Sequence, residues 1–228
     1  ADDLQRVTGR RLLVTNVPGA ASQAVIVGTL GKSALIQKLV AEGKLKDVNT
    51  IQGRWEATLV QVVAKPFPGV DRALVIVGSD RRGAAYGLMT LSQQIGVSPW
   101  YWWADVPVAH RDVLAIKVSG VATDAPAVKY RGIFINDEDW GLYPWAARTF
   151  DPEFKNIGPK TYEKVFELML RLRLNYFWPA MHGVSTEFGS VPENYQLAGK
   201  YGIVAALFLY PQLTFHEDSS IANPLKSQ

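Results

Sequence analysis

Three consecutive carboxylates follow an apolar run in the middle of the chain. The residues that come directly after this run are Asn136, Asp137, Glu138, Asp139 and Trp140. Cleavage of a glycosidic bond needs two carboxyl groups, one protonated to assist the leaving oxygen and one ionised to activate water or to attack. Repulsion among neighbouring carboxylates raises their pKa values, which would help one of them stay protonated. Taken alone, such a triplet more often begins a solvated loop or caps a helix.

The apolar run itself, residues 133–135, predicts a parallel strand that is buried on both faces. A second strand is predicted at residues 175–179, and a helix with one apolar face is predicted between them, from Pro159 to Leu172. Unusual side chains lie at or just after the end of the second strand, namely Trp178, Met181 and His182. The carboxyl ends of adjacent parallel strands share one edge of a sheet, where α/β folds bind their ligands. The pattern therefore predicts a site formed by both strand ends.

Other motifs favour structural interpretations. Residues 28–33 have the wrong glycine spacing for a nucleotide-binding loop, so a turn into a helix capped by Ser33 is predicted. The turn at residues 78–83 could hold a carboxylate or phosphate through Arg81 and Arg82, but a capped helix with a solvated turn is favoured. The aromatic residues 100–103 could stack on sugar rings, although packing between two domains is favoured.

The composition excludes several classes of function. The 228 residues are 48% hydrophobic and 20% charged, as in an ordinary globular protein. The net charge of +3 is spread along the chain, so neither nucleic acid nor a membrane surface is predicted as a partner. The absence of cysteine excludes disulfides and thiolate metal sites. His182 has no acidic or histidine partner at metal-binding spacing, so no metal and no cofactor are expected.

Strands and helices alternate over the first 120 residues, which indicates an α/β domain. Strands are predicted at residues 12–15, 24–28, 58–63 and 73–77, and helices at 35–43 and 84–95. Gly120, Asp124 and Pro126 mark a boundary, after which the pattern starts again. We therefore predict one domain at residues 1–125 and a second at 126–228.

Several long strings in both predicted domains carry a family resemblance. They are residues 28–33, 78–83, 94–108, 131–141, 144–147, 156–167 and 178–183. Together they resemble glycoside hydrolase family 115, the xylan α-1,2-glucuronidases, from about Leu12 to Val204. The resemblance implies a hexosaminidase-like α/β domain, followed by the first βα units of an incomplete (β/α)8 TIM barrel. It also implies an inverting reaction that releases glucuronic acid or its 4-O-methyl ether from glucuronoxylan or its oligosaccharides.

The resemblance also assigns roles to residues and defines what the chain lacks. Asp137 and Glu138 are expected to face the substrate pocket, and Trp178 is expected to stack on the sugar ring. Family members continue for several hundred residues, and the tail from about residue 205 diverges from them. The main acid and base are therefore expected outside this chain, which would be catalytically incomplete. The alternative is a non-catalytic, carbohydrate-binding or remnant fragment. Secreted or periplasmic localisation, and a homodimer in full-length relatives, follow from the resemblance alone.

Overall fold

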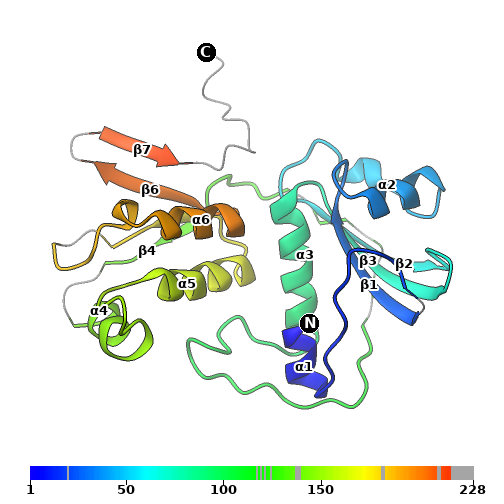
Figure 1. Ribbon diagram of the computed structural model, residues 1–228. Coiled ribbons are helices and arrows are strands. Elements are labelled where there is room, and N and C mark those ends of the chain that lie inside the picture. Colours follow the sequence, from blue (N-terminus) through cyan, green and yellow to red (C-terminus); the bar gives the residue numbers. More distant parts are fainter. Residues whose placement is uncertain are drawn as a thin grey trace. The chain divides into compact units, whose positions relative to one another are not determined.

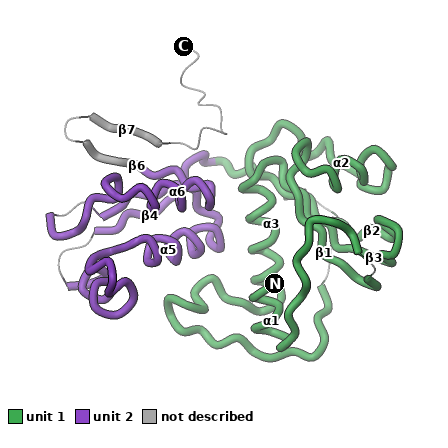
Figure 2. Tube along the Cα trace, viewed as in Figure 1, with its two compact units in different colours: residues 1–127 green, residues 128–228 purple. Residues whose placement is uncertain are grey.

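The computed structural model describes most of the chain (Figure 1). The described residues are 1–19, 21–116, 118, 120, 122–123, 125–136, 140–180, 183–209 and 212–216. The chain divides into two compact units, Ala1–Ala127 and Val128–Gln228 (Figure 2). Each unit contains its own sheet and its own helices, so the chain has a mixed α/β fold as predicted.

The first unit is built on a three-stranded sheet with the order β1-β3-β2. Strand β1 (Ala21–Thr29) is parallel to β3 (Val70–Gly78), and β2 (Thr58–Ala64) is antiparallel to β3. These three strands lie where the sequence predicted strands at 24–28, 58–63 and 73–77. The central strand β3 is largely buried, which agrees with its continuous apolar sequence.

Helices cover both faces of this sheet. Side chains alternate between faces along a strand, so Val75 and Val77 pack with α2 (Ala34–Ala41), whereas Ile76 packs on the opposite face with α3 (Arg81–Gln94). The α3 face also receives Val7 of α1 (Asp2–Thr8). A short 3-10 helix, η1 (Val48–Thr50), follows α2. This packing encloses two apolar clusters within one unit.

Side chains cap the two longer helices of the first unit as expected. The Ser33 hydroxyl accepts a hydrogen bond from the Ile36 N–H at the start of α2, and the Asp80 carboxylate accepts one from the Gly83 N–H at the start of α3. Residues 28–33 therefore form a capped turn, which supports the structural interpretation of that motif.

The strand predicted at residues 12–15 is wrong. These residues form no helix or strand, and Leu13 is 89% exposed. Short apolar runs form strands only when a neighbouring strand accepts their backbone hydrogen bonds. The two sheets of the described chain do not include this segment.

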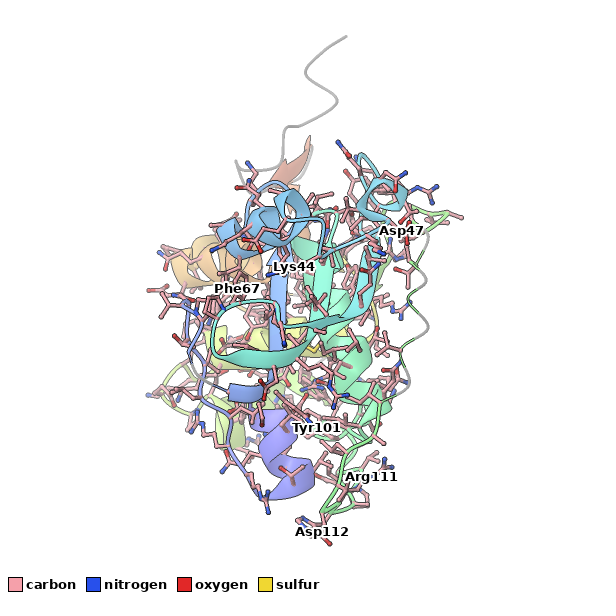
Figure 3. The ribbon with its side chains drawn as sticks, turned by 90° about the vertical axis from the view of Figure 1, so that its right-hand side faces the viewer. Lys44, Asp47, Phe67, Tyr101, Arg111 and Asp112 are labelled. Carbon is pink, nitrogen blue, oxygen red and sulfur yellow. The ribbon has the colours of Figure 1, made fainter. Side chains whose placement is uncertain are left out.

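The aromatic segment at residues 100–103 packs partly within the first unit. The Tyr101 ring joins the apolar cluster beside α3 and lies 4.7 Å from the Arg6 guanidinium carbon. Figure 3 shows Tyr101 toward the same end of the unit as Arg111, away from Lys44. Trp100 remains 45% exposed. The predicted role of this segment between domains stays a prediction.

The second unit contains a four-stranded sheet with the order β4-β5-β6-β7. Strands β4 (Gly132–Phe134), β5 (Tyr176–Trp178) and β6 (Val204–Leu209) are parallel. Strand β7 (Gln212–His216) is antiparallel to β6. The helical segments of this unit are α4 (Leu142–Trp145), the π-helix η2 (Ala146–Phe150), α5 (Pro159–Arg171), the 3-10 helix η3 (Phe188–Ser190) and α6 (Pro192–Tyr201).

The predicted βαβ unit is confirmed, because α5 connects the parallel strands β4 and β5. The apolar face of α5 packs into an aromatic core. Tyr162 and Phe166 of α5, Phe177 of β5 and Phe188 of η3 are almost fully buried. Their ring centroids lie 4.9 to 6.3 Å apart, mostly in edge-to-face arrangements. This core fixes β5 against α5 and η3.

Candidate functional site

The candidate site begins where β4 and β5 end side by side. Phe134 pairs with Trp178 in the parallel register, and the Ile135 N–H donates a hydrogen bond to the Trp178 carbonyl oxygen at 3.0 Å. The Phe134 and Trp178 rings meet edge to face, with centroids 5.3 Å apart. The two strand ends that the sequence singled out therefore lie at the same edge of the sheet.

Only part of the predicted residue set lies within the described residues. Asn136 is exposed two residues beyond β4, Trp140 is 83% exposed, and Trp178 is half-buried at the end of β5. The predicted residues outside the described ranges are Asp137, Glu138, Asp139, Met181 and His182. The structure thus brings Asn136 and Trp178 to adjacent strand ends, and the assignment of the carboxylates stays a prediction.

The predicted burial of the first strand is wrong in one respect. Phe134 is 50% exposed, although the sequence predicted a strand buried on both faces. Strand β4 lies at the edge of the four-stranded sheet, where a strand has a neighbour on one side only. The exposed Phe134 and Trp140 rings add apolar surface near the strand end, a surface type on which sugar rings stack.

Backbone contact at Gly132 sets the distance between the two strands. A Cβ atom at this position would lie 1.9 Å from the Tyr176 carbonyl oxygen, so only glycine allows the observed approach. Burial raises the pKa of Tyr176. The close approach at Gly132 sets the spacing of β4 and β5 two residues before the pair Phe134 and Trp178 at the site.

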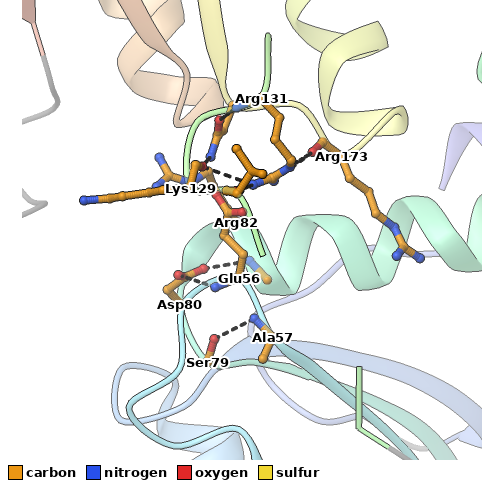
Figure 4. A network of polar contacts seen from close by, with 11 residues as sticks. Glu56, Ala57, Ser79, Asp80, Arg82, Lys129, Arg131 and Arg173 are labelled. Carbon is orange, nitrogen blue, oxygen red and sulfur yellow. Dashed lines mark hydrogen bonds and ion pairs between the residues drawn. The ribbon is translucent and has the colours of Figure 1, made fainter. Parts of the chain in front are cut away.

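A polar network fastens the opposite ends of the same strands (Figure 4). The buried Asn175 side chain donates to the Lys129 carbonyl oxygen at 2.7 Å and accepts from the Arg131 N–H at 2.9 Å. The Arg131 guanidinium donates to the carbonyl oxygens of Arg173 and Val128, both at 2.8 Å. These bonds join the amino ends of β4 and β5, away from the candidate site. Polar residues at that end of parallel strands support stability.

The turn at residues 78–83, which could have held an external anion, contacts carboxylates of the first unit itself. Arg82 is buried and its Nε lies 2.7 Å from Glu56 Oε1, whose side chain is fully buried (Figure 4). The Asp80 carboxylate accepts from the N–H groups of Glu56 and Gly83. Ser79 accepts from the Ala57 N–H at 3.0 Å. The capped helix predicted at residues 78–83 is therefore confirmed by the Asp80 cap, whereas the predicted solvated turn is wrong at Arg82, which is buried against Glu56.

An ion pair joins the two long helices of the second unit. Lys200 of α6 and the Tyr201 hydroxyl both donate to Glu163 of α5, each at 3.0 Å. The hydrogen bond from Lys200 is the main cause that lowers the pKa of Glu163, and the bond from Tyr201 acts in the same direction. This contact holds α6 against α5.

The described part of the chain contains neither a cluster of possible metal ligands nor a membrane-spanning helix. Among the described residues, no three histidine, cysteine or acidic side chains cluster as metal ligands would. No helix in the described ranges has the length and apolar character needed to cross a membrane.

Comparison with known proteins confirms the resemblance seen in the sequence. A family model described as glycosyl hydrolase family 115 matches residues 123–208, a range that contains both strand ends of the site. The chain resembles glycoside hydrolase family 115. No curated protein matches the chain.

One solved structure extends this family 115 resemblance over most of the chain. It is a family GH115 4-O-methyl-alpha-glucuronidase with specificity for decorated arabinogalactans. The two sequences are 40% identical, the TM-score is 0.76, and the match covers 90% of this chain. The chain spans 25% of the length of that enzyme. The relative is thus a glycoside hydrolase of which this chain matches one quarter.

Proposed function

We propose that this chain forms the amino-terminal portion of a family 115 α-glucuronidase and supplies one wall of its substrate pocket. The observation that carries this proposal is the 40% identity to the solved glucuronidase over 90% of the chain. The family match also spans both strand ends, 136–140 and 178–182. Residues 1–125 would form the hexosaminidase-like domain, and residues 126–228 the first βα units of a (β/α)8 barrel.

The parallel β4, β5 and β6 support the barrel proposal, because barrel strands are parallel and are joined by helices. In such a barrel the active site lies at the carboxyl ends of the strands, where Asn136 and Trp178 lie here. We assign Asp137 and Glu138 to the pocket and Trp178 to stacking on the sugar ring. The acid and base of the inverting reaction would stand roughly 6.5–9.5 Å apart to admit a water molecule.

The proposed substrate unit is glucuronic acid or its 4-O-methyl ether, carried as a side chain on a plant polysaccharide. The solved relative is specific for decorated arabinogalactans. Family resemblance in the sequence favours glucuronoxylan. The side-chain sugar is common to both substrates, so the two polysaccharides are the two arms of the test.

The test is an assay of the purified 228-residue chain with glucuronoxylan and with a glucuronate-decorated arabinogalactan. The pocket would be completed by residues outside the matched quarter, so we expect no release of glucuronic acid by the chain alone. Weak binding of 4-O-methylglucuronic acid is expected and can be measured by isothermal titration calorimetry. Release of the sugar acid would refute incompleteness, whereas the absence of any binding would refute the pocket assignment.

Binding of sugar without release would also fit the alternative of a non-catalytic, carbohydrate-binding fragment. Mixing the chain with the remainder of a family 115 enzyme separates these two proposals. Restored hydrolysis would identify the chain as the missing portion of an enzyme, and unchanged inactivity would favour the non-catalytic alternative. We also propose secretion or a periplasmic location and a homodimer of the full-length protein, to be checked by cell fractionation and light scattering.

A further inference from the structure

A turn before α5 contacts the segment that follows β5. The Asn156 side chain, half-buried in this turn, accepts a hydrogen bond from the Thr186 N–H at 3.0 Å. Its amide nitrogen donates to the Val184 carbonyl oxygen at 3.3 Å. One side chain therefore holds the backbone on both sides of Ser185. In a βαβ unit the start of the helix lies at the carboxyl end of the first strand, so this contact lies at the same end as the site.

The turn that carries Asn156 is itself held by a buried carboxylate. Asp151 is 1% exposed, and its Oδ2 accepts from both the N–H and the hydroxyl of Thr161, at 2.8 and 2.5 Å. Its backbone carbonyl accepts from the Phe154 N–H at 2.9 Å. At Gly158 an added Cβ would lie 2.9 Å from the Asp151 carboxylate carbon. The support of Asn156 is therefore fixed to the start of α5.

The segment held by Asn156 lies between two buried residues. Ala180, just after β5, and Phe188, in the aromatic core, are each 1% exposed. Met181 and His182 precede this segment in the sequence, separated from it by Gly183. The Asn156 amide donates to one backbone carbonyl oxygen of this segment and accepts from one backbone N–H. It thereby satisfies backbone groups as a paired strand would.

We propose that Asn156 is a positioning residue that fixes residues 184–186 after β5, and through them the end of β5 at Trp178. The inference rests on the proposed function for the chemistry of that site. The contact between Asn156 and residues 184–186 stands independently of the substrate. A side chain that served stability alone could be removed without changing the environment of the site residues once folding was complete. A positioning residue changes that environment in the folded protein.

The test compares three variants of the 228-residue chain by NMR. Asn156→Ala removes both bonds to the segment, and Asn156→Asp keeps the acceptor for the Thr186 N–H but loses the donor to Val184. Ser190→Ala is the control, because it removes a hydroxyl contact to the Glu187 carbonyl oxygen in the same unit without contacting residues 184–186 or the turn that carries Asn156. The measurements are the hydrogen-exchange rate of the Thr186 amide and the indole resonance of Trp178.

We expect Asn156→Ala to accelerate exchange at Thr186 about tenfold, as for the loss of an ordinary hydrogen bond. Asn156→Asp should retain most of the protection at Thr186. The Trp178 resonance should shift in Asn156→Ala and stay within the wild-type range in Ser190→Ala. Unchanged exchange at Thr186 in Asn156→Ala would overturn the proposal. An equal Trp178 shift in the control would also overturn it, because it would indicate a general loss of structure.

Titration with 4-O-methylglucuronic acid separates this inference from the proposed function. We expect the Trp178 indole resonance of the wild type to shift on titration, and the affinity to fall severalfold in Asn156→Ala. If the wild-type resonance does not respond at all, the proposed function fails while the exchange result still decides the role of Asn156. If the wild type binds and Asn156→Ala binds equally well, the positioning role is refuted.

Discussion

Replacing Gly132 by alanine should separate β4 from β5. The added Cβ would lie 1.9 Å from the Tyr176 carbonyl oxygen, and ordinary van der Waals contact begins near 3.4 Å. Relief of this clash requires the strands to move apart by about 1.5 Å. Such a movement would lengthen the bond from the Ile135 N–H to the Trp178 carbonyl oxygen, now 3.0 Å, beyond hydrogen-bonding distance.

The expected cost combines two effects. Forcing an extra carbon into a packed position costs about 1–3 kcal/mol. Loss of the bond at Ile135 adds about 1 kcal/mol. Because β4 is an edge strand, part of the strain can relax by movement of the strand, so we expect about 2–3 kcal/mol in total for the second unit.

Residue-resolved hydrogen exchange is the suitable assay, because two compact units need not unfold as one. The Ile135 amide should lose protection first in Gly132→Ala. The matched control is Gly199→Ala in α6 of the same unit, where an added Cβ would meet nothing within 4 Å. That variant should gain up to about 1 kcal/mol, because alanine favours helix. Wild-type stability and unchanged protection at Ile135 in Gly132→Ala would refute the argument from close approach.

Three further predictions concern other parts of the chain. Arg82→Met should destabilise the first unit by about 3–5 kcal/mol in urea unfolding, since it removes the positive charge beside the buried Glu56 carboxylate, and adding Glu56→Gln should recover much of the loss. Contact between α5 and α6 should weaken on acidification below about pH 4.5, because Glu163 has a lowered folded pKa, so its stabilising effect is present above the unfolded pKa and is lost as pH falls through the folded value. Lys200→Met should reduce this pH dependence in hydrogen exchange of α6, because Lys200 is the largest cause of the lowered pKa, and an unaltered profile would contradict the assignment. In the solved family 115 enzyme, replacing the residue that aligns with Asp137 by alanine should lower kcat about a hundredfold or more. Unchanged kinetics would refute the assignment of that carboxylate to the pocket.

Local patterns in the sequence were sufficient to predict the elements that carry the site. Pro159 at the first turn and the apolar face ending near Leu172 predicted α5 to within one residue at its carboxyl end. The apolar runs on either side of it predicted the parallel pair β4 and β5. These features depend on residues close together in the chain, and periodicity and helix-capping preferences report on such residues directly.

Contacts between distant residues could not be predicted in the same way. Arg82 pairs with Glu56, and nothing at either position in the sequence indicates the other. The exposure of Phe134 depends on its place at the edge of a sheet, which an apolar run alone does not reveal. Asn156 lies in a string that resembles family 115, but no local pattern assigns it a role, because its partners lie about thirty residues later. The only local signal was an asparagine shortly before the proline that begins a helix.

The carboxylate at the start of α5 also has a consequence for the order of folding. The residue before this helix is Gly158, which offers no capping side chain, and the N–H of Thr161 is bonded by Asp151 from ten positions earlier. A helix nucleus is costly to form, and here its first turn gains a cap only after the intervening loop has closed. We therefore expect helix initiation and loop closure to be coupled. We expect the two segments to appear together in refolding, and to open together when the folded chain fluctuates.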